Sequence, residues 1–319
     1  MNLHDIITDA VSVSSTNAGV RTTAAKLAEA WIEYGYGTAD EPGRFRHLEI
    51  IGTEVPFWVR LGETVYAAGY ADTLFRETTT GTVFVQEIKT TKSDKWYGES
   101  DWLKEIKRSA QPAIEALATV AGRWGATGMT IGDSGATGGA CVQVAALTKT
   151  SAPDLWPKDP KDGVLVYTPD TLAACRAMLL ATAAAIFKLR KQAGPWQWTG
   201  RQCIVFEGGG KKRDCEFMEP FCAAHAVAEK VTVEDGRSSD LRRLIERVEG
   251  MTAGQLDDPG YVVLSKSSIE LLHGCWEKYR IGKELGHRGP SSTAMEIGSA
   301  THAAIGALHD AMVRKDMVV

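Results

Sequence analysis

The stretch YAAGYADTLFRETTTGTVFVQEIKTTKSD, residues 66–94, decides the fold of this chain. Two runs rich in β-branched and aromatic residues flank the polar turn TTTG at 78–81, so the stretch predicts a β-hairpin. Its second strand is apolar over residues 83–85 and then carries an acid and a base, Glu87 and Lys89. Residues two apart share one face of a strand. The hairpin therefore ends either in a charged, solvated face or in the floor of a metal site.

Asp72 makes the metal site worth considering. It lies on the first strand, and hairpin pairing would bring it close to the face that carries Glu87 and Lys89. Two converging carboxylates can hold a divalent cation that activates a water molecule. A lysine beside them can orient that water or stabilise the charge that develops on a phosphate.

The rest of the chain predicts an α/β fold with a mixed sheet flanked by helices. Helical spacing of apolar residues predicts helices over 14–34, over 101–124 with an interruption at Pro112, and over most of 170–192. Strand patterns cover 44–62 and 140–150, and a short strand precedes the long helix at 164. The texture changes at Pro195 to a Gly- and Cys-rich segment, and a polar helix over 238–248 and two C-terminal helical segments follow.

Composition and charge leave the partner open. The chain is 44% hydrophobic and 24% charged, has no basic leader before an apolar run, and has no evident membrane span, so we expect a cytoplasmic protein without a membrane partner. Its net charge of −4 does not indicate a nucleic-acid coat, but a nuclease needs only a local basic groove. Lysines and aromatic rings alternate just after the hairpin and could stack on bases of single-stranded DNA or form a packed loop: Lys92, Lys95, Trp96, Tyr97 and Trp102.

Six cysteines occur in the chain. Cys141 and Cys175 lie in apolar runs, and we expect them to be core thiols. Cys203, Cys215 and Cys222 lie close together in a loop-rich segment, where thiolates could ligate zinc or an iron–sulfur cluster. Either metal needs a fourth ligand, for which the candidates are Cys275, His225 and His273.

These motifs together resemble a known family. Gly69-Tyr70-Ala71-Asp72, then Gln86-Glu87-Ile88-Lys89-Thr90, then Gln111 on the next helix resemble the PD-(D/E)XK nucleases of the RecB type. The segment with Cys203, Cys215 and Cys222 is similar to the tail of the iron–sulfur exonucleases in that family, namely AddB-type, CRISPR-associated and phage homologues. The position four residues after Gln111 holds Glu115, where the family often has tyrosine, and the short cysteine spacing common in the family is missing.

The order of the motifs differs from that of the family. The family's first cysteine and its Gly-x-x-x-His helix come before the hairpin, whereas Cys275, Gly298 and His302 lie at the far end of this chain. The family order is restored when the sequence is read as a circle, which implies a circular permutation. Termini that lie close together at the surface make such a permutation tolerable. The alternative is that the last part of the chain begins a second, incomplete copy.

The resemblance implies a restriction-endonuclease-like fold and a metal-dependent DNA exonuclease of recombination, repair or DNA processing. His302, Asp72, Glu87 and the carbonyl of Ile88 would ligate Mg²⁺ or Mn²⁺, Lys89 would position the attacking hydroxide, and Gln111 would contact the lysine or the substrate. Cys203, Cys215, Cys222 and Cys275 would hold a [4Fe–4S] cluster, with zinc as the alternative. The substrate would be single-stranded DNA or DNA ends, with a possible recombination or replication protein as partner. A non-cleaving binding module of the same fold is the alternative function.

The same resemblance divides the chain into four parts. Residues 1–195 would form the nuclease core, and residues 196–225 the cluster-binding segment. Residues 226–260 would be the linker that joins the ancestral ends. Residues 261–319 would be the helical part that completes the core.

Overall fold

A computed structural model describes residues 2–37, 43–45, 47–91, 98–134, 136–149, 153–158, 160–191, 204–207, 211–214, 236–284 and 293–314. The chain divides into two compact units, each of which is described by itself. The first contains Met1–Val59, Tyr70–Cys175 and Ser292–Val319. The second contains Arg60–Gly69 and Arg176–Ser291. The first unit therefore takes segments from both ends of the chain.

A mixed sheet forms the centre of the first unit. Its strands lie in the order β4-β1-β2-β3-β5-β6, and β7 also pairs with β5. The strands are β1 (Leu48–Arg60), β2 (Val65–Glu77), β3 (Thr82–Thr91), β4 (Arg123–Trp124), β5 (Thr137–Thr148), β6 (Leu155–Trp156) and β7 (Val164–Val166). The pairing of β2 with β3 is antiparallel across the turn at 78–81, which confirms the predicted hairpin. The predicted α/β class with a mixed sheet and flanking helices is also confirmed.

Strands β3 and β5 are parallel, and two helices make the crossover between them. These are α3 (Glu99–Arg108) and α4 (Ala110–Ala121). The predicted break at Pro112 was wrong by one turn, because the chain breaks at Ser109, whose hydroxyl accepts from the Gln111 N–H and caps α4. Pro112 lies in the first turn of α4, where a missing N–H has no intrahelical partner to lose.

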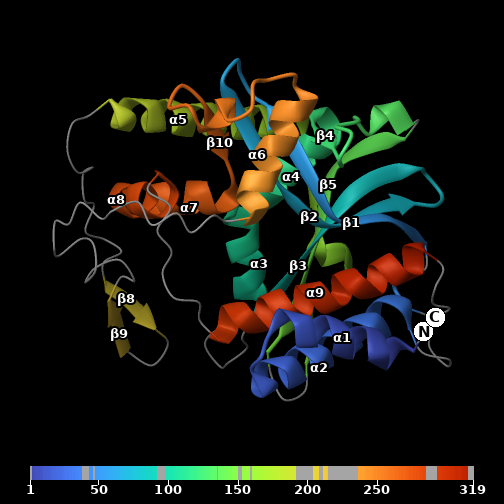
Figure 1. Ribbon diagram of the computed structural model, residues 1–319. Helices are drawn as coiled ribbons and strands as arrows, with labels where there is room; N and C mark the ends of the chain where they lie inside the picture. Colours follow the sequence, from blue (N-terminus) through green and yellow to red (C-terminus); the bar gives the residue numbers. More distant parts are fainter. Residues whose placement is uncertain are drawn as a thin grey trace. The chain divides into compact units, whose positions relative to one another are not determined.

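Three helices pack together in the first unit: α1 (Leu3–Ser14), α2 (Ala18–Tyr36) and the C-terminal helix α9 (Thr293–Val313). In Figure 1 the red α9 runs alongside the blue α1 and α2. Their shared core includes the fully buried Trp31 of α2, Leu308 of α9 and Leu147 of β5. The first and last helices of the chain therefore pack in one apolar core, and this core fixes α9 against the sheet.

Several further elements lie in the second unit. They are β8 (Ile204–Glu207), β9 (Lys211–Asp214), α6 (Gly236–Val248), β10 (Val262–Leu264), α7 (Lys266–Gly274), α8 (Trp276–Tyr279) and a π-helical turn (Arg280–Glu284). Strands β8 and β9 form a hairpin, and β10 pairs in parallel with the start of β2, Val262 opposite Val65. The polar helix predicted over 238–248 corresponds to α6.

Helix α5 (Pro169–Arg190) is the one described helix that is long and apolar enough to cross a membrane by length and composition. It buries Leu172, Leu179 and Ile186, which recur at helical spacing along one face. The helix also carries Arg176, whose guanidinium donates to the Leu61 carbonyl at 2.6 Å. The helix therefore buries one face within the protein and carries a charged side chain that contacts the backbone.

Candidate metal centre

Asp72 lies where the β2–β3 ladder ends. The last pair of the ladder joins Thr73 to Gln86, and the Asp72 side chain takes over the hydrogen bonding beyond it. Its Oδ2 accepts from the backbone N–H of Ile88 at 2.7 Å. This bond holds the carboxylate of β2 against the backbone of β3, next to Glu87 and Lys89.

Helix α9 approaches the same end of β3. A Cβ added at Gly298 would lie 3.1 Å from the Thr90 hydroxyl, so this glycine allows a close approach of the helix to the strand. His302 is one turn further along α9 and lies on the same face as Gly298. The Gly-x-x-x-His spacing therefore has a structural reason, because the glycine brings the helix close and the histidine then reaches Asp72 of β2.

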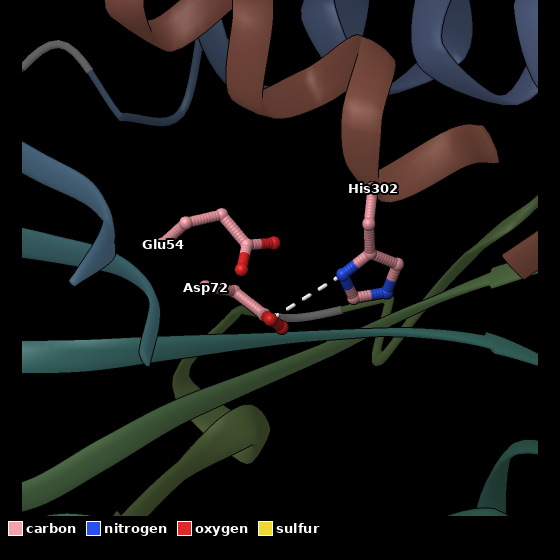
Figure 2. Close-up of side chains that lie close together, drawn as sticks. All are labelled: Glu54, Asp72 and His302. Carbon is pink, nitrogen blue, oxygen red and sulfur yellow. Dashed lines mark ion pairs between the residues drawn. The ribbon is translucent and has the colours of Figure 1, made fainter. Parts of the chain in front are cut away.

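His302 and Asp72 form the contact at the centre of the site. The His302 Nδ1 lies 3.3 Å from the Asp72 Oδ1, with the side chains 23% and 15% exposed (Figure 2). Burial would raise the pKa of Asp72, but His302, Lys89 and the Ile88 N–H together outweigh burial and lower it. Asp72 is therefore ionised at neutral pH. A partly accessible carboxylate and an imidazole in contact are suitable ligands for a cation.

Glu54 is the third member of this site, and sequence reasoning missed it. One ligand atom each from Glu54, Asp72 and His302 lies within 4.8 Å of the others. Figure 2 shows the Glu54 carboxylate beside Asp72 and His302. Glu54 comes from β1, Asp72 from β2 and His302 from α9. Glu54 has a φ of 47°, in the left-handed region that only glycine enters freely. The sequence feature closest to Glu54 that could have indicated an irregular backbone is Gly52, two residues earlier in the same strand.

Glu87 and Lys89 form a neighbouring pair on β3. The Lys89 ammonium contacts the Glu87 Oε1 in an ion pair, and the Glu87 side chain has no exposed surface. Ile88 between them packs in the core with α9, so Glu87 and Lys89 leave the strand on the opposite face. The group of three possible ligands among the described residues contains Glu54 in place of the predicted Glu87. The role of Glu87 and of the Ile88 carbonyl as metal ligands stays a prediction.

A second histidine of α9, His309, lies in a closed polar network. Its Nε2 lies 3.4 Å from the Trp31 Nε1 and 3.2 Å from the Tyr36 hydroxyl, and its Nδ1 lies 3.1 Å from the Thr73 hydroxyl. The Trp31 N–H can only donate, so Nε2 accepts and the proton of the neutral ring is on Nδ1. Burial lowers the pKa of His309 to about 3, against a smaller opposing effect of Asp72.

Gln111 contacts another side chain of α4. Its side-chain amide donates to the Glu115 Oε1 at 2.8 Å, one turn along α4. Glu115 is 1% exposed. The pKa of Tyr167 is raised mainly by the burial of Tyr167 and, to a smaller extent, by the charge of Glu115. A contact of Gln111 with Lys89 or with the substrate stays a prediction.

The remaining predicted site residues fall in three groups. Cys203, Cys215, Cys222, Lys92, Lys95, Trp96 and Tyr97 lie outside the described residues. Trp102 is 4% exposed on α3, which favours the packed alternative over base stacking. Cys275 is a buried thiol at the end of α7. Of the two thiols expected in the core, Cys175 is buried and Cys141 is half-buried.

No protein-family model, no curated protein and no solved structure matches this chain. The case for a function therefore rests on the residues and on their geometry.

Proposed function

We propose that this protein is a divalent-metal-dependent nuclease that hydrolyses phosphodiester bonds of DNA, with single-stranded DNA or DNA ends as substrate. The observation that carries the proposal is the 3.3 Å contact between His302 and Asp72. It joins the last helix of the chain to the central hairpin, within one compact unit. The hairpin carries the acid-x-lysine pattern, and the helix carries the Gly-x-x-x-His pattern.

The donor set suits Mg²⁺ or Mn²⁺. Asp72 and Glu87 offer carboxylate oxygens, and His302 offers an imidazole nitrogen, a mixture that favours Mn²⁺. Apart from the Lys89 contact, the fully buried Glu87 carboxylate has no hydrogen-bond partner among the described residues. A buried carboxylate in this state is costly unless a cation or a donor completes it. When bound, the metal would supply a more acidic water and polarise the phosphate.

Lys89 supports a hydrolytic role for the site. Its ammonium contacts Glu87 and also lowers the pKa of Asp72, so its charge lies close to both carboxylates. We assign it to the attacking water, which it would orient toward the phosphorus. The water forms the new P–O bond, the bond to the sugar oxygen breaks, and that oxygen takes up a proton.

The cysteines supply the second part of the proposal. Cys203, Cys215, Cys222 and the buried Cys275 would hold a [4Fe–4S] cluster with a structural role, in a chain that is circularly permuted relative to RecB-type nucleases. Anaerobically purified protein should be brown and contain iron and sulfide. A colourless protein that contains one bound zinc would contradict the [4Fe–4S] cluster and support the zinc site instead.

Degradation of end-labelled single-stranded DNA in Mn²⁺ tests the enzymatic role. Wild type should degrade the DNA, and Lys89→Ala should lose about a hundredfold or more in rate, within the range of removing a group that stabilises transition-state charge. Lys158→Ala is the matched control, because Lys158 also contacts a carboxylate, that of Asp154, but is 62% exposed. Lys158→Ala should retain the wild-type rate.

Two results would reject the nuclease. Folded, metal-loaded wild type could leave DNA intact, or Lys89→Ala could cleave as fast as wild type. DNA binding without cleavage by wild type would favour the alternative, a module that grips DNA ends.

A further inference from the structure

We infer that Glu54 is a ligand of the cation bound by Asp72 and His302, so that the metal centre is built on three secondary-structure elements. This inference rests on the metal site of the proposed function and deepens it. Glu54 has no counterpart among the motifs that the sequence shares with the nuclease family. Its place in the site follows from the structure alone.

The geometry is that of a mixed ligand set. The carboxylates of Glu54 and Asp72 and the imidazole of His302 bring three ligand atoms within 4.8 Å of one another. They come from the middle of β1, the middle of β2 and the first half of α9 (Figure 2). Two carboxylate oxygens and one imidazole nitrogen match Mn²⁺ better than Ca²⁺, which prefers oxygen ligands only.

Helix α9 also holds the strand residues that adjoin the two carboxylates. The hydroxyl of Thr53, next to Glu54, donates to the Asp310 carboxylate. The hydroxyl of Thr73, next to Asp72, is bonded to the His309 Nδ1 at 3.1 Å. The helix that supplies His302 thus anchors both strands beside their carboxylates, as supporting contacts around a metal site do.

A buried carboxylate next to the group provides independent support. Glu87 is fully buried, and its Oε2 has no hydrogen-bond partner among the described residues. Asp72 accepts from the backbone N–H of Ile88, the residue after Glu87, so the two carboxylates come from neighbouring positions of β2 and β3. The cation site therefore lies at the edge of a buried anionic centre, which favours a divalent over a monovalent ion.

Mn²⁺ titration followed by electron paramagnetic resonance tests the inference on the full chain. Glu54→Gln removes the charge at constant size and should weaken Mn²⁺ binding by about tenfold or more. Glu54→Gly removes the whole side chain at a φ that glycine adopts readily, so this variant should fold. It provides a second measurement in case Glu54→Gln misfolds. Glu49→Gln is the matched control on the same strand, since Glu49 is exposed and contacts Arg76. It should bind Mn²⁺ as wild type does.

The outcomes separate this inference from the proposed function. Wild-type Mn²⁺ affinity in both Glu54 variants would overturn the role of Glu54, even if wild type cleaves DNA. Absence of Mn²⁺ binding by folded wild type would overturn it as well. Loss of Mn²⁺ binding in both variants, with no DNA cleavage by wild type, would support the metal site and reject the nuclease.

Discussion

The two histidines of α9 lie on one helix and contact adjacent residues of β2, yet their environments differ. His302 contacts the carboxylate of Asp72, and its side chain remains 23% exposed. His309 has no exposed surface, and its ring nitrogens contact a hydroxyl of Thr73, an indole and a phenol. One histidine can still receive a cation, whereas the hydrogen-bonding positions of the other are occupied.

In the proposed site, one helix carries both a metal ligand, His302, and an anchor, His309. The His309 network fixes the register of α9 against β2 and α2, and this register places His302 at Asp72. The network tolerates only the neutral ring, because a second ring proton would be directed at a donor. We therefore expect substitutions at His309 to act on stability and substitutions at His302 to act on metal binding and catalysis.

The largest expected effect is that of His309→Ala. It leaves a cavity and removes a partner from Trp31, Tyr36 and Thr73, so the free energy of unfolding should fall by about 4 kcal/mol. Urea unfolding at pH 7.5 without metal measures it. His302→Ala is the control, and its cost should stay below about 1 kcal/mol because its side chain is partly exposed. Equal losses in the two variants would remove the distinction between anchor and ligand.

The next largest expected effect is a loss of stability in acid that is caused by His309. The pKa of His309 is about 3 in the folded protein and 6.5 as a free side chain, so the unfolded state binds the proton more readily. The stabilising preference for neutral His309 is complete above pH 6.5 and is lost as pH falls toward 3. The expected slope is about 1.4 kcal/mol per pH unit, or about 2 kcal/mol between pH 6.5 and 5.

Denaturant unfolding of wild type and His309→Gln over this pH range measures the slope. Glutamine does not titrate, so the variant should lose most of the difference between pH 6.5 and 5. A variant with the wild-type pH dependence would show that other groups cause the acid sensitivity.

The smallest effect concerns the anchor of β1. Thr53→Val removes the hydroxyl that donates to Asp310 and should lower the free energy of unfolding by about 1 kcal/mol. Since Glu54 is the next residue, Mn²⁺ affinity should fall severalfold. Calorimetric titration with Mn²⁺ measures the affinity, and Thr22→Val, with an exposed hydroxyl on α2, is the control. Wild-type affinity in Thr53→Val would show that this anchor does not position Glu54.

Local pattern predicted much of the fold. The hairpin of β2 and β3 was recognisable because alternation and turn residues lie close together in the sequence. The helix predicted over 14–34 is α2, but a separate helix α1 precedes it, and α2 begins where Asn17 accepts from the Gly19 and Val20 N–H groups. A single capping side chain sets the start of α2, as Ser109 sets the start of α4. The position of a helix end depends on tertiary packing as well as on helix propensity, so the sequence pattern alone did not locate it.

The site was only partly visible in the sequence. Asp72, Glu87 and Lys89 formed a local pattern, and His302 entered through a resemblance in cyclic order. Glu54 could not be found in this way, because a glutamate within a strand is ordinarily a solvated residue. Its role depends on a positive φ and on two partners from distant parts of the chain. His309 escaped notice for a similar reason, since its partners come from α2 and β2.

The most direct test of the account compares DNA cleavage by the two histidine variants. Wild type, His302→Ala and His309→Gln are assayed on end-labelled single-stranded DNA with Mn²⁺ at pH 7.5, where circular dichroism shows each to be folded. Wild type and His309→Gln should cleave, and His302→Ala should lose about a hundredfold or more of the rate with loss of a metal ligand. Cleavage by His302→Ala at the wild-type rate, or no cleavage by wild type, would contradict a metal-dependent nuclease centred on Asp72 and His302.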